Sequence, residues 1–166
     1  MLYLMQANYK DLVKEFAFTD KMPYDENGFI YEYCGTKRED FENVIGKMID
    51  AQSGIGLPSG YVPETIYFLW KGEEIVGMFR FRHYLCPSLI EGGGHIGYYI
   101  GREFRGKGYA TKGLRLLIKE TRDSLREDEF YLRVNKDNIA SQKVILENGG
   151  YVHHSDDEKV YLRIKK

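Results

Sequence analysis

A glycine-rich basic turn constrains this chain more than any other feature. The run Arg105-Gly106-Lys107-Gly108-Tyr109-Ala110 lies between a predicted strand, His95 to Ile100, and a stretch of helical periodicity that begins near Ala110. Glycines adopt positive φ readily and keep side chains out of a ligand's path. Successive backbone N–H groups can then converge on one point, and the first turn of a helix adds partial positive charge. The turn therefore predicts a pyrophosphate site, to which Arg105 and Lys107 add charge.

The same glycines could serve the geometry of the turn alone, with both basic side chains in solvent. Two known phosphate motifs are absent from the chain. The P-loop pattern GxxxxGK[ST] does not occur, and GxGxxG fails because Thr111 stands at the third glycine. Asp128 and Glu129 precede the next predicted strand, whereas a dinucleotide fold needs its acid at the end of one. The interpretation as a nicotinamide- or nucleotide-binding domain is thus supported by the glycines only.

The bulk composition fits one ordinary globular domain of 166 residues with a net charge of -1, so we expect no nucleic-acid partner. Cys34 and Cys86 make no disulfide framework and no CxxC pair, which suits a reducing compartment, although a single bridge between them stays open. No apolar run approaches the ~18 residues of a membrane span. The segment Met1 to Ala7 lacks the features of a signal peptide. We expect a cytoplasmic protein with no membrane partner.

The first sixty residues predict a strand and two helices separated by an aromatic and acidic loop. Leu2 to Met5 is the predicted strand. Asn8 can cap the first helix, which should end near Thr19, and Thr36 with Glu39 forms a capping-box pattern before the second. The expected apolar stripes are Tyr9, Leu12, Val13 and Phe16 in the first helix, and Phe41, Val44, Ile45, Met48 and Ile49 in the second.

The remaining hundred residues alternate between strand and helix patterns. Pro87 to Gly94 is predicted as a loop, and Arg82 with His83 as the end of a strand. Together with the first part, the element order is βααβββαβαββ, an α/β fold in one domain spanning residues 1–166 with a mixed central sheet. The predicted strands are Thr65 to Trp70, Ile75 to Leu85, His95 to Ile100, Phe130 to Val134, Tyr151 to His154 and Val160 to Ile164, and the helices start at Ala110 and Asn138.

Two sequence blocks resemble the GNAT superfamily of N-acetyltransferases. The Arg105 to Ala110 turn matches that superfamily's coenzyme A signature, R/Q-x-x-G-x-G/A. Asn138-Ile139-Ala140-Ser141 through Glu147-Asn148-Gly149-Gly150-Tyr151 is similar to its second conserved block. The likeness covers about residues 64 to 166. The sequence from Gly94 to Tyr98 most resembles that of predicted bacterial acetyltransferases of undefined substrate. The resemblance implies acetyl transfer from acetyl-coenzyme A to a primary amine; a non-catalytic acyl-coenzyme A sensor with the same fold is the alternative.

The resemblance also implies where acetyl-coenzyme A would lie. The strands His95 to Ile100 and Phe130 to Asn135 would splay apart, and the pantetheine arm would fill the gap. The backbone of Tyr99, Ile100 and Gly101 would hydrogen-bond the arm or polarise the thioester carbonyl. The remaining cofactor-binding residues expected from the two blocks are Arg105, Gly106, Lys107, Gly108, Tyr109, Ala110, Asn138 and Ser141.

Direct attack by an amine needs a proton acceptor and a proton donor. Many relatives use a tyrosine in the last helix as the donor, but counting back from Gly150-Tyr151 puts Leu146 there, so Ser141 is the substitute we expect. The candidate bases are His95, Tyr98 and Glu91. Because Tyr98 and Tyr99 point to opposite faces of a strand, at most one of them should reach the groove.

Neither a metal site nor a particular acceptor is indicated. Adjacent strand residues such as His153 and His154 should point to opposite faces, and no cluster of carboxylates or cysteines accompanies them. By resemblance, residues 1–63 form the acceptor-binding part and 64–166 the acetyl-coenzyme A core. The acceptor would be a small-molecule amine or a peptide or protein amine, and a homodimer is compatible with the sequence. The segments expected to bind it are Lys21 to Gly35, whose Asp25, Glu26 and Glu32 suit a cationic amine, and Ser53 to Pro63.

Overall fold

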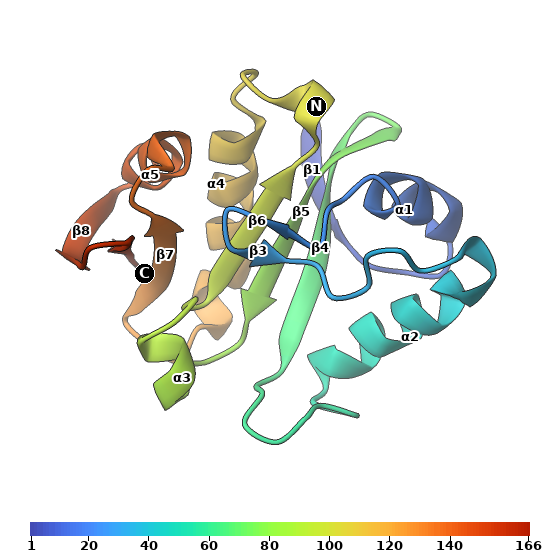
Figure 1. Ribbon diagram of the computed structural model, residues 1–166, viewed down its shortest axis with the longest axis horizontal. Helices are drawn as coiled ribbons and strands as arrows, with labels where there is room; N and C mark the ends of the chain where they lie inside the picture. The colour runs from blue at the N-terminus through green and yellow to red at the C-terminus, as the bar shows by residue number, and fades with distance from the viewer.

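Two sheets lying side by side form the centre of the molecule, which a computed structural model describes over residues 1–166 (Figure 1). Within each sheet all neighbouring strands pair antiparallel. The larger sheet has the order β1 (Leu2–Gln6), β4 (Glu64–Lys71), β5 (Glu74–Arg82) and β6 (Ile96–Ile100), and the smaller has the order β7 (Glu129–Asn135), β9 (Lys159–Lys165) and β8 (Gly150–Ser155).

Helices cover both faces of the larger sheet and enclose a separate apolar core on each. Helices α1 (Leu12–Thr19) and α2 (Phe41–Gln52) pack on one face, and α4 (Tyr109–Thr121) packs on the other, behind β6 in Figure 1. Helix α5 (Ile139–Leu146) packs against α4 and the smaller sheet, and α3 (Pro87–Ile90) is a single turn. No helix has the length and apolar character needed to cross a membrane.

The element order agrees with the sequence prediction, and the expected α/β fold is confirmed, but the strands pair antiparallel throughout and do not form the expected mixed sheet. One addition is a small hairpin, β2 (Asp25–Glu26) and β3 (Phe29–Ile30), inside the predicted aromatic loop. Its two-residue turn, Asn27-Gly28, has positive φ at both residues, 54° and 85°, as a type I′ turn requires. Asn-Gly is the sequence signal for such a hairpin. Figure 1 shows the hairpin lying in front of β6.

The predicted face of the first helix is only half right: Leu12 and Phe16 pack against the core, but Tyr9 and Val13 do not. Tyr9 and Val13 are 54% and 65% exposed, and the helix buries Glu15, Phe18 and Thr19 instead. Asn8 does accept a hydrogen bond from the Asp11 N–H at 3.0 Å, but regular helix begins only at Leu12. The prediction chose the buried face from apolar side chains alone, so it could not include the buried carboxyl of Glu15.

The second helix forms as predicted but without its predicted cap. The Thr36 hydroxyl donates to the Tyr33 carbonyl at 2.6 Å, and a 3₁₀ turn, Arg38–Asp40, leads into α2. The apolar stripe is otherwise confirmed, since Phe41, Val44, Ile45 and Met48 are buried and Ile49 is half-buried. Cys34 and Cys86 are both free, so the bridge between them is absent.

Strands β6 and β7 meet only at one end. A single bridge joins Gly94 to Leu132, and the His95 N–H donates to the Tyr131 carbonyl at 2.8 Å. Gly94 has φ +64°, and a Cβ there would lie 2.1 Å from the Tyr131 oxygen, so only glycine permits this approach. Beyond this junction the two strands are unpaired, which confirms the expected splay and opens the space described next.

Candidate active site

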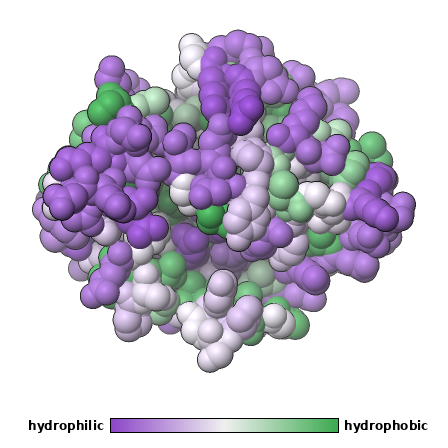
Figure 2. Space-filling view, viewed as in Figure 1, coloured by the Kyte–Doolittle hydropathy of each residue, from purple (hydrophilic) through white to green (hydrophobic).

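A cavity of about 730 Å³ occupies the gap between β6 and β7. It is lined by the β2–β3 hairpin, by β5 and β6, by the glycine-rich turn with the first residues of α4, and by β7 and α5. Figure 2 shows a hollow near the middle of this face, where hydrophobic atoms are visible among hydrophilic surroundings. The two sequence blocks that carry the GNAT resemblance therefore line one space.

The glycine-rich turn presents bare backbone to the cavity. Gly106 and Gly108 have φ values of +72° and +73°, and a Cβ added at either would meet nothing within 4 Å. Gly108 caps α4 in the left-handed conformation, and no side chain bonds the free amides of the first helical turn. Tyr109, Ala110 and Thr111 line the cavity there. The amides are thus available to a phosphate group.

The two basic side chains of this turn do not point at that phosphate position. Arg105 donates through Nε to the Ile100 carbonyl at 3.0 Å and through a terminal nitrogen to Glu26 at 2.5 Å. Its hydrogen bond lowers the pKa of the Glu26 carboxyl. Lys107 donates to the Glu103 carbonyl at 3.1 Å and lies outside the cavity. Arg105 thus lines the cavity as the partner of Glu26, and Lys107 lies beside it on the outside.

The backbone of β6 directs alternate residues toward the gap. The Gly101 N–H donates to the Val76 carbonyl of the neighbouring strand at 3.0 Å, and the His95 carbonyl accepts from Arg82 at 2.8 Å. Antiparallel pairing alternates, so Tyr99 also pairs with β5, whereas Tyr98 and Ile100 turn their N–H groups toward the gap. Of the three backbone donors expected from the sequence, only Ile100 faces the cavity, and Tyr98 joins it.

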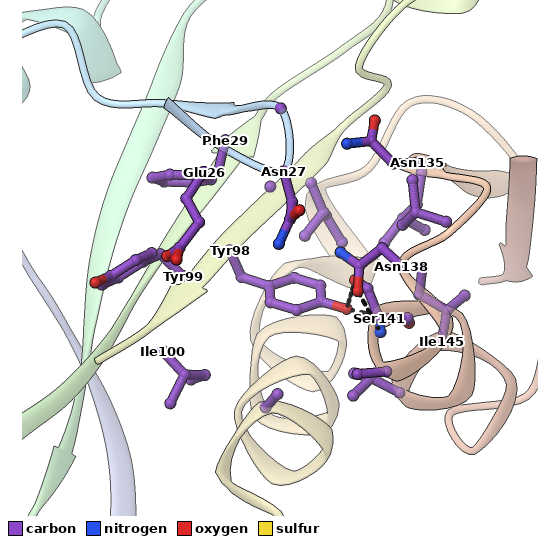
Figure 3. Close-up of a pocket in the computed structure, with 18 of the residues that line it drawn as sticks. Glu26, Asn27, Phe29, Tyr98, Tyr99, Ile100, Asn135, Asn138, Ser141 and Ile145 are labelled. Atoms are coloured by element: carbon purple, nitrogen blue, oxygen red, sulfur yellow. Dashed lines mark hydrogen bonds between the residues drawn. The ribbon is translucent and has the colours of Figure 1, made fainter. Parts of the chain in front are cut away.

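Tyr98 and Ser141 form a hydroxyl pair across the gap. Figure 3 shows the Tyr98 ring reaching from β6 toward Ser141 on α5, and the two hydroxyl oxygens are 2.5 Å apart. Asn138 caps α5 by accepting the Ser141 N–H at 3.2 Å, which fixes the position of the serine. Burial raises the pKa of Tyr98 to about 12. The phenol therefore keeps its proton at neutral pH and does not suit the role of base expected for it.

Tyr99 also lines the cavity, but the two tyrosines point to opposite faces of β6 as expected. Its ring points to the other face of β6, where it packs against Phe18 and Phe29 at centroid distances of 6.1 and 6.3 Å. The Arg105 guanidinium lies over the same ring, 5.4 Å from its centroid. Because β6 is the edge strand of its sheet, the cavity extends around both of its faces.

His95 and Glu91, two of the candidate bases, lie outside the cavity. His95 is fully buried, and both of its ring nitrogens are engaged. Nδ1 accepts the Tyr131 N–H at 2.9 Å, and Nε2 lies 3.0 Å from Glu127. Burial lowers the pKa of His95, so the ring is neutral and joins the start of β6 to β7. Glu91 is exposed. The structure brings neither residue to the site.

Leu146, the expected replacement for the usual tyrosine, lies outside the cavity. Leu146 is 47% exposed, whereas Ile145 is fully buried and lines the cavity. Both side chains are apolar, so neither can donate a proton, and Ser141 remains the hydroxyl that α5 offers.

The acidic residues expected to hold a cationic amine have other partners. Asp25 accepts the Gly28 N–H at 2.9 Å inside the hairpin, and Glu26 pairs with Arg105. Glu32 pairs with Arg80 at 2.9 Å. The hairpin does line the cavity, but no residue of the second expected segment, Ser53 to Pro63, does so.

His153 and His154 do not point to opposite faces. A register shift in β8 between Val152 and His154 breaks the alternation, and the two Nδ1 atoms lie 2.8 Å apart. His154 stacks on Tyr161 with a centroid distance of 4.2 Å. No group of three or more His, Cys, Asp or Glu side chains is arranged to hold a metal ion.

The chain matches the family model described as an acetyltransferase (GNAT) domain over residues 13–150. It belongs to the GNAT acetyltransferase family. Acetyl transfer is therefore its class of activity, and the sequence resemblance is confirmed. No curated protein matches the chain in sequence.

Solved GNAT structures share the fold at low sequence identity. A GNAT-family acetyltransferase from Streptococcus pneumoniae is 15% identical over 98% of this chain and 97% of its own, with a TM-score of 0.64. The N-acetyltransferase PseH from Campylobacter jejuni, in complex with acetyl coenzyme A, is 18% identical over 100% and 99%, with a TM-score of 0.58. Spermidine N-acetyltransferase from Vibrio cholerae, in complex with CoA and spermine, is 15% identical over 99% and 95%, with a TM-score of 0.66.

Proposed function

We propose that this chain transfers an acetyl group from acetyl-coenzyme A to a primary amine, with no covalent enzyme intermediate. One observation carries the proposal: a single cavity joins the uncapped start of α4, the outward-facing amides of β6 and the Tyr98–Ser141 hydroxyl pair. Family membership indicates acetyl-coenzyme A as the donor. When bound, it supplies a thioester whose carbonyl carbon the amine attacks while the thiolate leaves.

The residues of the cavity have separate parts in this proposal. The amides of Gly108 to Thr111 would hold the pyrophosphate at the start of α4. The N–H groups of Tyr98 and Ile100 would hydrogen-bond the arm and the thioester oxygen as negative charge develops on it. The region 64–166 would thus form the donor side, and the hairpin of the region 1–63 would line the acceptor side.

We assign Ser141 as the proton donor to the leaving thiolate; the serine oxygen takes up the proton that the attacking nitrogen loses, so the products are the amide and the free thiol. The Tyr98 O–H can donate to the Ser141 oxygen, which leaves the serine hydrogen free to point into the cavity. Tyr98 keeps this arrangement because its pKa of about 12 maintains the phenol in the neutral form. No imidazole lines the cavity, and its two carboxylates are engaged, Glu26 by Arg105 and Glu147 by Thr111. The nucleophile is therefore an amine that arrives in its neutral form.

The test is a free-thiol assay with acetyl-coenzyme A and a panel of acceptors comprising spermidine, amino acids, aminoglycosides and peptide N-termini. We expect thiol release that depends on one class of amine and rises with pH as that amine loses its proton. Tight binding of acetyl-coenzyme A without amine-dependent thiol release would favour the non-catalytic sensor, which the apolar Leu146 also allows. Failure to bind acetyl-coenzyme A would contradict both functions.

A further inference from the structure

The half of the cavity that faces away from α4 is lined by four cationic side chains, Arg80 and Arg82 of β5, Arg133 of β7 and Lys159 of β9. In each strand the neighbours in sequence belong to the core on the α4 side. Because side chains alternate between the faces of a strand, these four point to the opposite face. We call them the cationic wall.

Carboxylates compensate the wall only on the side of β5. Arg80 pairs with Glu32 at 2.9 Å and lies 3.5 Å from Glu64, and Arg82 lies 3.9 Å from Glu64. Arg80 is only 8% exposed, and its contact with Glu64 is made by Nε, at ion-pair distance but without hydrogen-bond geometry. Burial lowers the pKa of Arg82, and the neighbouring Arg80 and Arg133 add to the effect. On this side of the wall, two carboxylates therefore balance two guanidinium groups.

The other two cations have no carboxylate partner. Arg133 forms neither an ion pair nor a side-chain hydrogen bond. Lys159 donates to the neutral Asn135 amide oxygen at 2.5 Å. The wall as a whole therefore sets four cations against two carboxylates. An excess of positive charge in a partly enclosed cavity favours an anion.

The pyrophosphate of the donor is not the anion that explains this wall. Its proposed cradle lies at the start of α4, on the other face of the sheet. Arg105, the cation beside that cradle, is already neutralised by Glu26. The uncompensated cations, Arg133 and Lys159, lie instead on β7 and β9, on the face of the strands opposite α4.

We propose that the acceptor is an amine that also carries a carboxylate, and that the cationic wall binds this carboxylate. The inference rests on the proposed acetyl transfer and names the substrate class for the same site. Guanidinium groups bind carboxylates through paired hydrogen bonds, and Arg133 has all of its donors free for this. An amino acid or a peptide with a free carboxyl end meets the requirement, whereas the cationic wall would repel the positive charges of a polyamine.

The experiment compares matched acceptors that differ in one charge: L-alanine with L-alaninamide, trialanine with its C-terminal amide, and spermidine as the cationic probe. Thiol release gives kcat/KM for each, and calorimetry with the CoA complex gives binding. We expect at least about a tenfold preference for one carboxylate over its amide. Arg133→Gln should remove this preference by raising KM, Arg133→Lys should retain part of it, and Arg115→Gln, an exposed change on α4, should leave it intact.

Equal or better rates with the amides, or a preference for spermidine, would overturn the carboxylate proposal while leaving acetyl transfer in place. The same holds if acetyl-coenzyme A binds but neither L-alanine nor trialanine is acetylated or binds to the CoA complex. A preference for carboxylates that survives in Arg133→Gln would also overturn the assignment of the wall. Loss of acetyl-coenzyme A binding in the wild-type protein would instead contradict the proposed function.

Discussion

Two buried titratable side chains, Tyr98 and Glu15, both keep their protons at neutral pH because burial raises their pKa values. The consequences differ. Tyr98 is a phenol that is neutral in water as well, so burial costs it little, and its hydroxyl orients Ser141. Glu15 would ionise in the unfolded chain, so keeping it neutral opposes folding. One residue serves the chemistry that we propose, and the other lowers stability.

Removing the two hydroxyls of the Tyr98–Ser141 pair one at a time should show which of them donates the proton and which only orients the other. We expect Ser141→Ala to lower kcat by roughly 10²-fold, the range for loss of a general acid, and Tyr98→Phe to lower it by about tenfold because the serine proton remains. Single-turnover thiol release measures both. Ser155→Ala, an exposed change on β8, is the control. Full activity in Ser141→Ala would rule out the assigned donor.

Glu15→Gln should stabilise the fold at neutral pH. The carboxyl is fully buried, its Oε1 accepts the Asn8 N–H at 3.1 Å, and its Oε2 has no partner. Burial raises its pKa from 4.5 to about 8. Between these values the folded state binds the extra proton, so stability falls as pH rises, by about 1.4 kcal/mol per unit. The variant should gain roughly 1 to 3 kcal/mol at pH 7 and little at pH 4.

Urea unfolding of the wild type and of Glu15→Gln at both pH values measures this gain. Glu39→Gln, at an exposed position, should change stability by less than about 0.5 kcal/mol and serves as the matched control. A gain for Glu15→Gln that is equal at pH 4 and pH 7 would show that ionisation of Glu15 is not its cause.

The elements that matter most for the site are β6 and β7, and one histidine fixes where they separate. Removing the His95 ring leaves the buried Tyr131 N–H without its acceptor and Glu127 without its donor. We expect His95→Leu to lower the free energy of unfolding by about 1 to 3 kcal/mol without changing the shape of the pH–rate profile. His153→Leu, on the exposed β8, is the control. A changed profile at unchanged stability would instead identify His95 as a base.

Local signals predicted the elements well where the period was strong. The stripe of α2 and the alternation of β7 and β9 are visible in the sequence because each buries one face. The face of α1 was missed because Glu15 occupies a buried position. The sequence prediction did not include the β2–β3 hairpin, although Asn27-Gly28 is a signal for its turn. Helix caps depend on local hydrogen bonds that compete with one another, as Thr36 shows.

The candidate site was predictable in its backbone but not in its side-chain partners. The glycines of the turn and the cap at Asn138 follow from local conformation, and both line the cavity. The partners of Arg105 and Arg80, Glu26 and Glu32, lie far away in sequence. No local pattern indicates such pairings. For that reason Glu26 and Glu32 were expected to meet a ligand, whereas each pairs with an arginine.

At the scale of the whole molecule, the first part of the chain closes the site built by the second. Ion pairs from Glu26 to Arg105 and Arg102 hold the hairpin against the glycine-rich turn. At its tip, Gly28 lies close to β7, since a Cβ added there would be 3.8 Å from the Asn135 side chain. Figure 3 shows Asn27 pointing into the space between Tyr98 and Asn135. We therefore propose that residues 1–63 and 64–166 work as one unit, in which the acceptor side cannot form without the donor side.

The most direct test of this account is a calorimetric titration of acetyl-coenzyme A into the wild type, Gly108→Asp and Gly60→Asp. Both glycines have positive φ, +73° and +84°, with no protein atom within 4 Å of an added Cβ, so the two substitutions carry similar backbone strain. Only Gly108 lines the cavity. We predict that Gly108→Asp weakens binding by at least about tenfold, or 1.4 kcal/mol, whereas Gly60→Asp binds as the wild type does. Equal affinities in all three proteins would contradict the assigned donor site.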